Sequence, residues 1–312
     1  MAALAIVIVS WNTRELLDRC LRSVHTSLAN SGIGYQVVVV DNASSDGTPA
    51  MLRAEHPEVE LIESGGNLGF AGGNNLALRR ILGDRDWGIG IDSQSPTPKP
   101  QSPNPDYIML LNPDTEVIGD ALVQLVRYLE EHPDVAVVGP KLLYPDGSAQ
   151  PSRRRFPERA TFFWESTPLE TRWPNNPWAR RYRYADAPDD REQEVGWLVG
   201  AALLVRRAAI ERAGLLDAGF AMYSEELEWQ RRIGRLGIRD WGLGIGGVAI
   251  TSPKSHTLTP IPYRVIYFPS AVIIHHEGKS SEQAPARRYL QFQRSRLRDA
   301  RMTYGAGFAA AL

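Results

Sequence analysis

Two runs of apolar residues end in acidic turns, and these turns are the first candidates for chemistry. Tyr107 to Leu111 has the composition of a buried strand, and Asp114 follows shortly after its end. Val37 to Val40 is a second such strand, and it runs directly into Asp41. Because ligands in open α/β sheets sit at the carboxyl ends of strands, the two turns predict a site for a metal ion and a nucleotide.

Each acidic turn also has a structural explanation. Asp is common at helix starts, so Asp114 could cap the helix expected at Gly119 to Glu131. Asp46 could either bind the ligand or cap the helix expected at Thr48. Asn112, two residues before Asp114, adds a polar group to the same turn. Mg²⁺ is typically held by one or two carboxylates together with substrate phosphates, so one aspartate and a bound diphosphate would be sufficient.

A pair of histidines closes a further apolar run. His275 and His276 follow Val272 to Ile274, which has the composition of a strand. A histidine at such a strand end could complete the coordination of a metal ion or contact a phosphate. A purely structural role is the alternative for either residue.

The first strand, Leu4 to Val9, is followed by polar residues and not by a glycine-rich loop. This excludes both a Rossmann pyrophosphate turn and a P-loop. A nucleotide must then be held differently. Ser10 and Asn12 offer short polar groups at the strand end, and Asp41 could accept hydrogen bonds from a base or a ribose hydroxyl.

The segment Asn67 to Asn75 is dense in glycine and asparagine, and the helix expected at Phe70 to Leu82 begins within it. Asn67, Gly69, Ala71 and Asn74 belong to this segment. Small residues let a backbone approach a ligand closely, and helix N-termini favour anionic groups. The segment therefore predicts a ligand contact, with a capped glycine-rich turn as the alternative.

Glu225 and Glu226 lie at the start of a charged helix expected at Met222 to Leu236. The helix dipole favours acidic residues there, so a solvated acidic face is one interpretation. The other is a general base, which requires one carboxylate within hydrogen-bond reach of the proton that it removes.

The elements that position these groups alternate between strand and helix, which predicts right-handed crossovers and a mostly parallel sheet. Pro157 to Glu194 is irregular and rich in Trp, Pro and Arg, so we expect a loop or lid there. Val195 to Val205 is expected to be one strand, and Val265 to Phe268 and Ala271 to Ile274 two short ones. The fold class is thus α/β, with helices flanking the sheet.

Two segments interrupt the alternation and resemble each other. Asp86-Trp87-Gly88-Ile89-Gly90-Ile91 is nearly repeated as Asp240-Trp241-Gly242-Leu243-Gly244-Ile245, and each leads into a stretch rich in Ser, Thr and Pro. Such stretches do not pack a core. We expect exposed inserts at 84–106 and 238–262 within one domain spanning 1–283, followed by a basic amphipathic helix at 284–312.

The overall composition narrows the function. A net charge of −1 argues against a nucleic-acid partner, which usually requires a basic surface. The single cysteine, Cys20, excludes a disulfide framework and the common zinc-cluster patterns. No apolar stretch reaches the roughly 18–20 residues of a membrane span, and the apolar start lacks the features of a signal peptide, so a cytoplasmic protein is expected.

The last helix offers a possible membrane contact. Its arginines, Arg287, Arg288, Arg294, Arg298 and Arg301, are interleaved with Tyr289, Phe292 and Leu297. It could rest on an anionic membrane surface at the inner face of the cell membrane. A charged packing helix is the alternative.

In combination, these motifs resemble a family 2 glycosyltransferase with a GT-A fold, of the rhamnosyltransferase-like group. The matching stretches span most of the chain: Ile6 to Asn12, Val38 to Gly47, Asn67 to Asn75, Leu110 to Glu116, Trp197 to Arg207, Phe220 to Arg232 and Ala271 to Gly278. The resemblance implies an inverting enzyme with a GT-A type, Rossmann-like sheet, a nucleotide-diphosphate sugar donor and Mg²⁺ or Mn²⁺. It favours dTDP-rhamnose as the donor and a lipid-linked or polysaccharide acceptor.

The resemblance also implies residue roles. Asp41 would hold the base, Asp114 the metal ion, and Glu226 would be the catalytic base with Glu225 beside it. Trp197, Gly200 and Ala201 would line the sugar and acceptor pocket. The chain departs from the usual pattern at Asn112, which replaces the first Asp of the metal motif, at Glu226, where many relatives have Asp, and at Ala221, where an aromatic residue is frequent.

Two other interpretations share this architecture. A nucleotidyltransferase would have metal carboxylates too, but it normally carries a glycine-rich, basic loop after the first strand, which Trp11-Asn12-Thr13 does not provide. A sugar-nucleotide binder disabled by the inserts would bind the donor without turnover.

Overall fold

A computed structural model describes residues 3–83, 104–220, 222–236, 263–277 and 285–312. The expected insert at 238–262 lies outside these residues, as does that at 84–106 except for its last three positions. There, the Asp106 N–H donates to Ala3 O at 2.8 Å. None of the helices in the described ranges combines the length and apolar character that a bilayer crossing requires.

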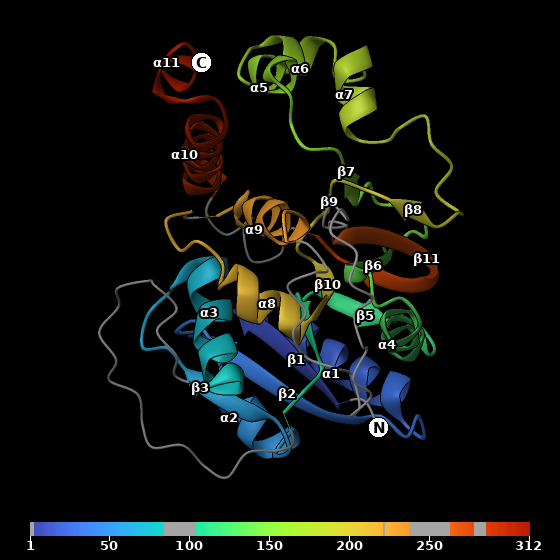
Figure 1. Cartoon of the computed structure of the whole chain (residues 1–312). Coiled ribbons are helices and arrows are strands. Elements are labelled where there is room, and N and C mark those ends of the chain that lie inside the picture. Colours follow the sequence, from blue (N-terminus) through green and yellow to red (C-terminus); the bar gives the residue numbers. More distant parts are fainter. Residues whose placement is uncertain (1–2, 84–103, 221, 237–262, 278–284) are drawn as a thin grey trace.

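A nine-stranded sheet forms the centre of the molecule (Figure 1). Its order is β3-β2-β1-β4-β10-β6-β11-β5, with β8 beside β11. The strands are β1 (Ala3–Ser10), β2 (Gly34–Asp41), β3 (Glu60–Glu63), β4 (Tyr107–Leu111), β5 (Thr115–Val117), β6 (Val135–Leu143), β8 (Gln193–Glu194), β10 (Ala202–Arg206) and β11 (Arg264–His275). Strands β10, β5 and β8 are antiparallel to their neighbours, and the other pairings are parallel. The prediction of a mostly parallel sheet flanked by helices is confirmed.

Helices cover both faces of this sheet and create two hydrophobic cores. One core includes apolar side chains of α1 (Arg14–Leu28), α2 (Thr48–Glu55) and α4 (Ala121–Glu131). The other includes those of α3 (Gly69–Leu82), α8 (Arg207–Ala213) and α9 (Glu225–Gly234). Successive residues of a strand point to opposite faces, so Ile6 and Ile8 enter the first core whereas Ala5 and Val7 enter the second.

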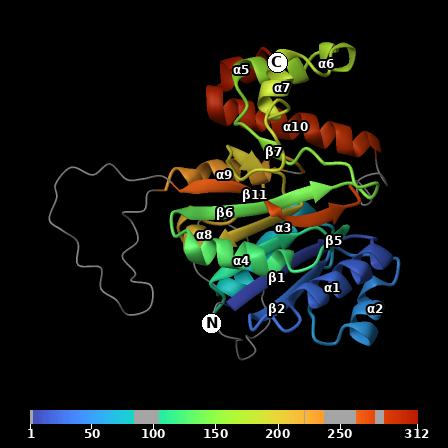
Figure 2. The same cartoon turned by 90° about the vertical axis from the view of Figure 1, so that its right-hand side faces the viewer.

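A helical lobe stands over one edge of the sheet, on the far side of α9 (Figures 1 and 2). It contains α5 (Arg159–Glu165), α6 (Leu169–Arg172), α7 (Pro177–Tyr182), α10 (Pro285–Tyr304) and α11 (Ala306–Ala310). The expectation of a loop at Pro157 to Glu194 is therefore wrong. Helices α5, α6 and α7 are too short to show a 3.6-residue period, and aromatic contacts stabilise them: the Trp164 ring lies 5.5 Å from Trp173 and 5.9 Å from Trp178.

Two other boundaries differ from the expectation. Val195 to Val205 is not one strand, because β9 (Trp197–Leu198) pairs with β7 (Arg153–Arg154) in a separate small sheet and β10 begins only at Ala202. The two short strands expected near the end are one strand, β11, with a register shift between Phe268 and Val272. The break between β9 and β10 places Trp197, Gly200 and Ala201 in the lining of the pocket described below.

Helix α10 is anchored to the protein on its inner side. Arg231 of α9 forms an ion pair with the buried Asp299, and Arg296 donates hydrogen bonds to the carbonyls of Phe162 and Glu165 in α5. Arg298 pairs with Asp217 at 2.7 Å. Through these contacts α10 packs against α9 and α5, which agrees with the alternative of a charged packing helix.

Candidate functional site

A pocket of about 720 Å³ lies between the carboxyl ends of the strands and the helical lobe. The turn after β4 contributes Asn112 and Asp114, β11 contributes His275, and the start of α9 contributes Glu225 and Glu226. Its lining also includes Asn67, Gly69, Trp197, Gly200 and Ala201. Helix α10 closes the far wall with Phe292, Arg296 and Asp299. The pocket thus brings together residues predicted from five separate stretches of the sequence.

Asp114 and His275 form the polar centre on the sheet side. Asp114 Oδ1 lies 3.3 Å from His275 Nε2, and both side chains are buried. The Asn112 amide nitrogen lies 3.3 Å from the same ring nitrogen. Asp114 is followed by strand β5 and not by a helix, so it does not cap α4, which begins at Ala121.

Gln150 fixes the orientation of the His275 ring. Its amide nitrogen donates to Glu277 at 2.8 Å, which leaves its amide oxygen facing His275 Nδ1 at 2.9 Å. An amide oxygen only accepts, so Nδ1 carries a proton, and a ring without a second proton presents the lone pair of Nε2 toward Asp114. Carboxylate and imidazole lone pairs that face each other are the donor set of a divalent cation, with Gln150 orienting the ligand from behind.

His276 points the other way, because successive side chains of an extended chain alternate. Its ring nitrogen lies 2.7 Å from Glu116, outside the pocket lining, and only its backbone N–H reaches Asp114, at the carbonyl oxygen. The structure therefore brings His275 to Asp114 and leaves the His276 ring apart. The expectation that both rings reach the metal site is not met by this geometry.

Cys20 lies directly beneath the Asp114 turn. Its sulfur is 3.4 Å from the Thr115 hydroxyl and 3.6 Å from the Asn112 carbonyl oxygen. Burial raises the pKa of the Cys20 thiol to about 12. The Cys20 side chain is thus a small buried group.

Glu225 and Glu226 begin α9 immediately after a left-handed turn. Tyr223 and Ser224 have φ angles of 69° and 70°, which aim the first turn of the helix into the pocket. Both carboxylates are buried, and among the residues described one oxygen of each lacks a hydrogen-bond partner. Unpartnered buried oxygens of this kind are available to a substrate hydroxyl.

Burial raises the pKa of both carboxyls above the usual range. For Glu225 the negative charge of Glu226 raises the pKa further. For Glu226, the backbone N–H of Gly200 and the positive charge of Arg154 partly offset the burial. Two buried carboxyls side by side will not both ionise easily, and Glu226 has the surroundings that better tolerate the negative charge.

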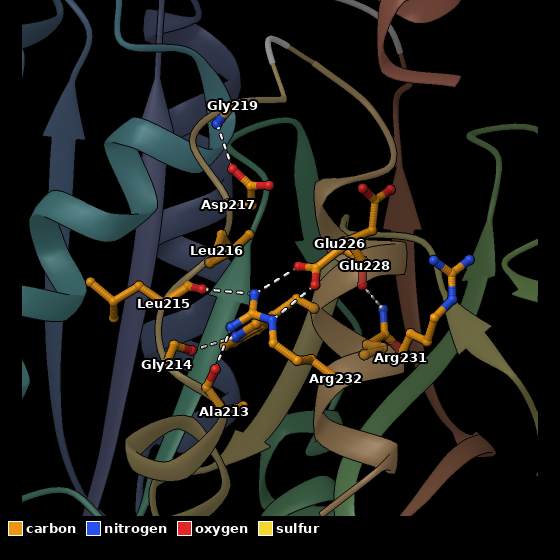
Figure 3. Close-up of polar contacts among 12 residues, drawn as sticks. Ala213, Gly214, Leu215, Leu216, Asp217, Gly219, Glu226, Glu228, Arg231 and Arg232 are labelled. Atoms are coloured by element: carbon orange, nitrogen blue, oxygen red, sulfur yellow. Dashed lines mark hydrogen bonds and ion pairs between the residues drawn. The ribbon is translucent and has the colours of Figure 1, made fainter. Parts of the chain in front are cut away.

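Other contacts hold α9 in place. Arg232 binds Glu228 in the same helix and the carbonyl of Leu215, and the Trp229 ring nitrogen donates to Gly214 at 2.8 Å (Figure 3). The carboxylate of Glu226 takes no part in the contacts among the residues of Figure 3. Of the acidic residues at this helix start, Glu228 is therefore structural, whereas Glu226 keeps a free oxygen.

Strand β9 and the residues after it connect the sheet side of the pocket with the lobe side. Trp197 donates from its ring to Arg155 O at 2.9 Å, and Ala201 O accepts from the Asn112 N–H at 2.9 Å. A Cβ on Gly200 would lie 3.2 Å from the Phe70 ring and 3.6 Å from the Glu226 Cβ. A side chain at position 200 would crowd the Phe70 ring, which would have to shift by a few tenths of an ångström.

Several residues expected at the nucleotide are used within the fold. Ser10 bonds Thr13 at 2.9 Å, the Asn12 side chain accepts from the Ser45 N–H, and Asn74 donates to Phe70 O in its own helix. Asp46 accepts from Arg14 N and from Thr48 N, so its carboxylate joins the starts of α1 and α2. Ala71 lies in the core. These five residues do not line the pocket, and their side-chain contacts favour the structural alternative.

Asn67 and Gly69 line the pocket, whereas Asp41 lies beside the lining residue Asn42. Asp41 accepts from Ser44 N with one oxygen, and its other oxygen is buried without a partner among the described residues. Gly69 has a φ of 71°, and Asn67 accepts from its N–H at 3.0 Å. Asn42, next to Asp41, donates to Gly69 O and links this turn to the end of β2.

Several pocket residues were missed by sequence reasoning, and three of them bear on the site. Gln150 orients His275, while Arg154 and Tyr182 lie on the lobe side, with the half-buried Arg154 guanidinium 5.9 Å from the Tyr182 ring centre. Burial lowers the pKa of Arg154 and raises that of Tyr182. The run of arginines at 153–155 was the available signal for Arg154. No local pattern marks Gln150, whose partner is 125 residues away.

Comparisons with known proteins show similarity to glycosyltransferases. Residues 5–96 match the sequence model of glycosyl transferase family 2. The chain is 29% identical to an N-acetylglucosaminyl-diphospho-decaprenol L-rhamnosyltransferase from Mycobacterium tuberculosis, over 91% of this chain and 79% of that protein. It is 25% identical to the Escherichia coli rhamnosyltransferase WbbL, over 75% of this chain and 78% of that protein.

Solved structures share the fold. A mannosyltransferase from Pyrobaculum calidifontis, in complex with GDP-Man and Mn²⁺, has a TM-score of 0.53 at 17% identity over 95% of this chain. GalNAc-T7 with UDP, GalNAc and Mn²⁺ has a TM-score of 0.54 at 14% identity over 88% of this chain. The chain spans only 63% and 43% of these two proteins.

The sheet, the pocket at its carboxyl edge and these relatives define a glycosyltransferase with the GT-A fold. Over residues 5–96 the chain resembles glycosyltransferase family 2, and the relatives that it resembles along most of its length include rhamnosyltransferases.

Proposed function

We propose that the chain transfers rhamnose from dTDP-rhamnose to a hydroxyl of a lipid-linked or polysaccharide acceptor, with inversion. The observation that carries this proposal is the shared pocket, in which the buried Glu225–Glu226 pair stands opposite Asp114 and His275. The mycobacterial and E. coli relatives are rhamnosyltransferases by name, which supports rhamnose, and the name of the former also supports a lipid-linked acceptor.

Glu226 is the proposed base of a single displacement. It takes the proton of the acceptor hydroxyl, whose oxygen attacks the anomeric carbon from the face opposite the nucleotide, and the nucleoside diphosphate leaves. The free buried oxygen of Glu226 and its raised pKa support this role, since a base is most effective when its pKa lies near the working pH. Glu225 then keeps its proton and limits the negative charge in the pocket.

Asp114 and His275 are the proposed ligands of a divalent cation, Mg²⁺ or Mn²⁺. The buried carboxylate and the oriented imidazole fit such an ion, and the two structural neighbours above were solved with Mn²⁺. When bound, the ion would offset the charge that develops on the leaving diphosphate. Asn112, with its amide beside both ligands, would orient them.

The proposed donor site extends from these ligands toward β1 and β2. Gly69 and Asn67 form a turn that lets the diphosphate approach the backbone at the start of α3, a 14-residue helix. Asp41 has a buried acceptor oxygen for the base. Trp197, Gly200 and Ala201 line the opposite side, where the sugar and the acceptor would meet.

The helical lobe is the proposed acceptor side. Helix α10 closes the pocket with Phe292 and Arg296, and its outer side exposes Tyr289, Leu290, Leu297 and Met302 beside basic residues. An exposed apolar and basic helix suits a membrane surface that holds a lipid-linked acceptor.

A donor screen tests this function. Purified protein with Mg²⁺ or Mn²⁺ is mixed with a panel of nucleotide sugars, and release of nucleoside diphosphate is followed with and without a lipid extract. We expect release from dTDP-rhamnose that requires both the metal and the extract. Pyrophosphate as the product would instead identify a nucleotidyltransferase, and binding without release under every condition would identify a non-catalytic binder.

A further inference from the structure

A cluster of His25, His56 and Glu58 lies far from the pocket, against the outer side of β2 and β3. His25 belongs to the last turn of α1, His56 ends α2, and Glu58 lies in the loop before β3. Each residue offers one ligand atom, and these atoms all lie within 4.8 Å of one another. Among the residues described, this is the one such triad of His, Cys, Asp or Glu.

The distances within the triad suit coordination by one ion. Glu58 Oε1 lies 2.9 Å from His25 Nε2 and 3.6 Å from His56 Nδ1. Ligands at about 2.0–2.1 Å from a tetrahedral zinc ion are roughly 3.3 Å apart, which falls between these two values. A modest rotation of either ring would complete the arrangement.

The ring nitrogens that face away from Glu58 both have partners. His56 Nε2 lies 2.8 Å from Asp18 Oδ1, and His25 Nδ1 lies 2.8 Å from the Tyr35 hydroxyl. Metal-bound histidines almost always donate their second N–H to such a carboxylate or other oxygen, which leaves the first nitrogen as a ligand. Asp18 is itself fixed by a hydrogen bond from Arg22 at 3.0 Å.

His25 Nε2 supplies a separate observation. It is buried and makes no hydrogen bond within the described residues, although it lies 2.9 Å from Glu58 Oε1. At that distance only a poor angle prevents a hydrogen bond, so a proton on Nε2 would not point at the carboxylate. His25 Nε2 and Glu58 Oε1 are thus close together without a hydrogen bond between them, as two ligand atoms of one cation would be.

We propose that His25, His56 and Glu58 form a zinc site that ties the end of α1 to the loop between α2 and β3. Two imidazoles and a carboxylate suit Zn²⁺, and the half-exposed Glu58 side chain leaves the fourth position open to water. The site needs no cysteine, so the sequence patterns common to zinc clusters do not reveal it. Its role is structural and independent of sugar transfer.

Zinc binding to chelator-treated protein tests the proposal. Every variant carries Asp114→Asn, so that the pocket does not compete for the ion, and Zn²⁺ affinity is measured by competition with a chromophoric chelator. We expect about one equivalent to bind, and Glu58→Gln or His25→Gln to weaken binding at least about tenfold. Zn²⁺ should also raise the melting temperature, and Glu58→Gln should abolish that rise.

Glu55→Gln is the matched control, because Glu55 is a nearby exposed acid that pairs with Arg22 and not with the triad. Glu58 and His25 are partly exposed, so their variants should melt like the control in the absence of zinc. If His25→Gln does not fold, Glu58→Gln decides the test. Equal zinc affinity in the control and in Glu58→Gln, or no zinc bound to the Asp114→Asn protein, would overturn the proposal.

Discussion

The side-chain amide of Gln230 forms two hydrogen bonds with the backbone of Leu198, accepting from its N–H at 2.9 Å and donating to its carbonyl at 2.7 Å. Gln230 is fully buried in α9, and Leu198 belongs to β9. This contact fixes the helix that carries Glu226 against the strand that leads into Gly200.

Gln230→Met should therefore harm both stability and activity. The substitution leaves a buried N–H and a buried carbonyl without their partner, which costs on the order of 1–3 kcal/mol for each unsatisfied group. We expect a lower free energy of unfolding in urea and a lower kcat, because Glu226 loses its fixed position. Gln124→Met is the control, since that exposed amide bonds only Asp120 on the surface of α4. Equal effects of both variants would contradict the role of the contact.

Glu226→Gln should reduce the rate of transfer by about 10²–10⁴-fold while nucleotide binding is kept. The amide is nearly isosteric but cannot accept the proton of the acceptor hydroxyl. Steady-state kinetics and donor titration separate the two effects. Glu228→Gln, in the same helix turn, should instead lower stability through the lost Arg232 contact and leave the rate within a few-fold. A Glu226→Gln enzyme with the parental rate would exclude Glu226 as the base.

Glu225 should make the folded protein less stable as the pH rises. Its pKa is raised in the folded state by burial and by Glu226, so the folded protein holds this proton at pH values where the unfolded chain has lost it. The stability from this group is complete below the unfolded value of about 4.3 and is lost as the pH rises through the folded pKa. The melting temperature of Glu225→Gln, compared with that of the parent at the same pH, should therefore increase as the pH rises. A difference in melting temperature that stays constant with pH would refute this.

Asp114→Ala and His275→Ala should weaken the metal-dependent binding of the donor. Calorimetric titration of the nucleotide sugar with and without Mn²⁺ measures this effect. Gln150→Leu should weaken it about 10–100-fold, because the ring of His275 loses the partner that orients it. His276→Ala is the control, since that ring contacts Glu116 outside the pocket. Unchanged donor affinity of Asp114→Ala in the presence of Mn²⁺ would rule out its role as a ligand.

Leu290→Asp in α10 should reduce binding to vesicles of anionic lipid, measured by flotation. The Leu290 side chain is exposed on the outer side of the helix, so an added negative charge there repels the lipid surface without disturbing the core. Ile118→Asp, on the opposite part of the molecule, is the control. No flotation of the parent protein, or equal flotation of both variants, would exclude α10 as the contact.

The strand ends were predictable and the side-chain partners were not. Apolar runs that stop at Asp114 and His275 are local signals, and parallel strands bring such ends to one edge of a sheet. Local sequence does not show that Asp46 bonds Arg14 or that His276 turns toward Glu116. These choices depend on contacts between residues 32 and 160 positions apart.

The part of the helical lobe between Pro157 and Glu194 escaped prediction for a different reason. Its helices α5, α6 and α7 span four to seven residues, too short for a periodic pattern, and contacts of Trp164 and Arg296 stabilise them. The split between β9 and β10 was equally hidden, because an apolar run does not show that Gly200 must leave the strand to pass between Phe70 and Glu226.

Alkylation of Cys20 can measure how often the contact between α1 and the Asp114 turn opens. The chain has a single thiol, and in the native protein it is fully buried and strongly resists ionisation, so alkylating reagents have no thiolate to attack. Labelling can proceed only in molecules in which α1 has separated from that turn. The rate at which Cys20 of the parent protein is alkylated, followed by mass spectrometry, therefore reports how often this part of the site opens. No cysteine has to be introduced as a probe.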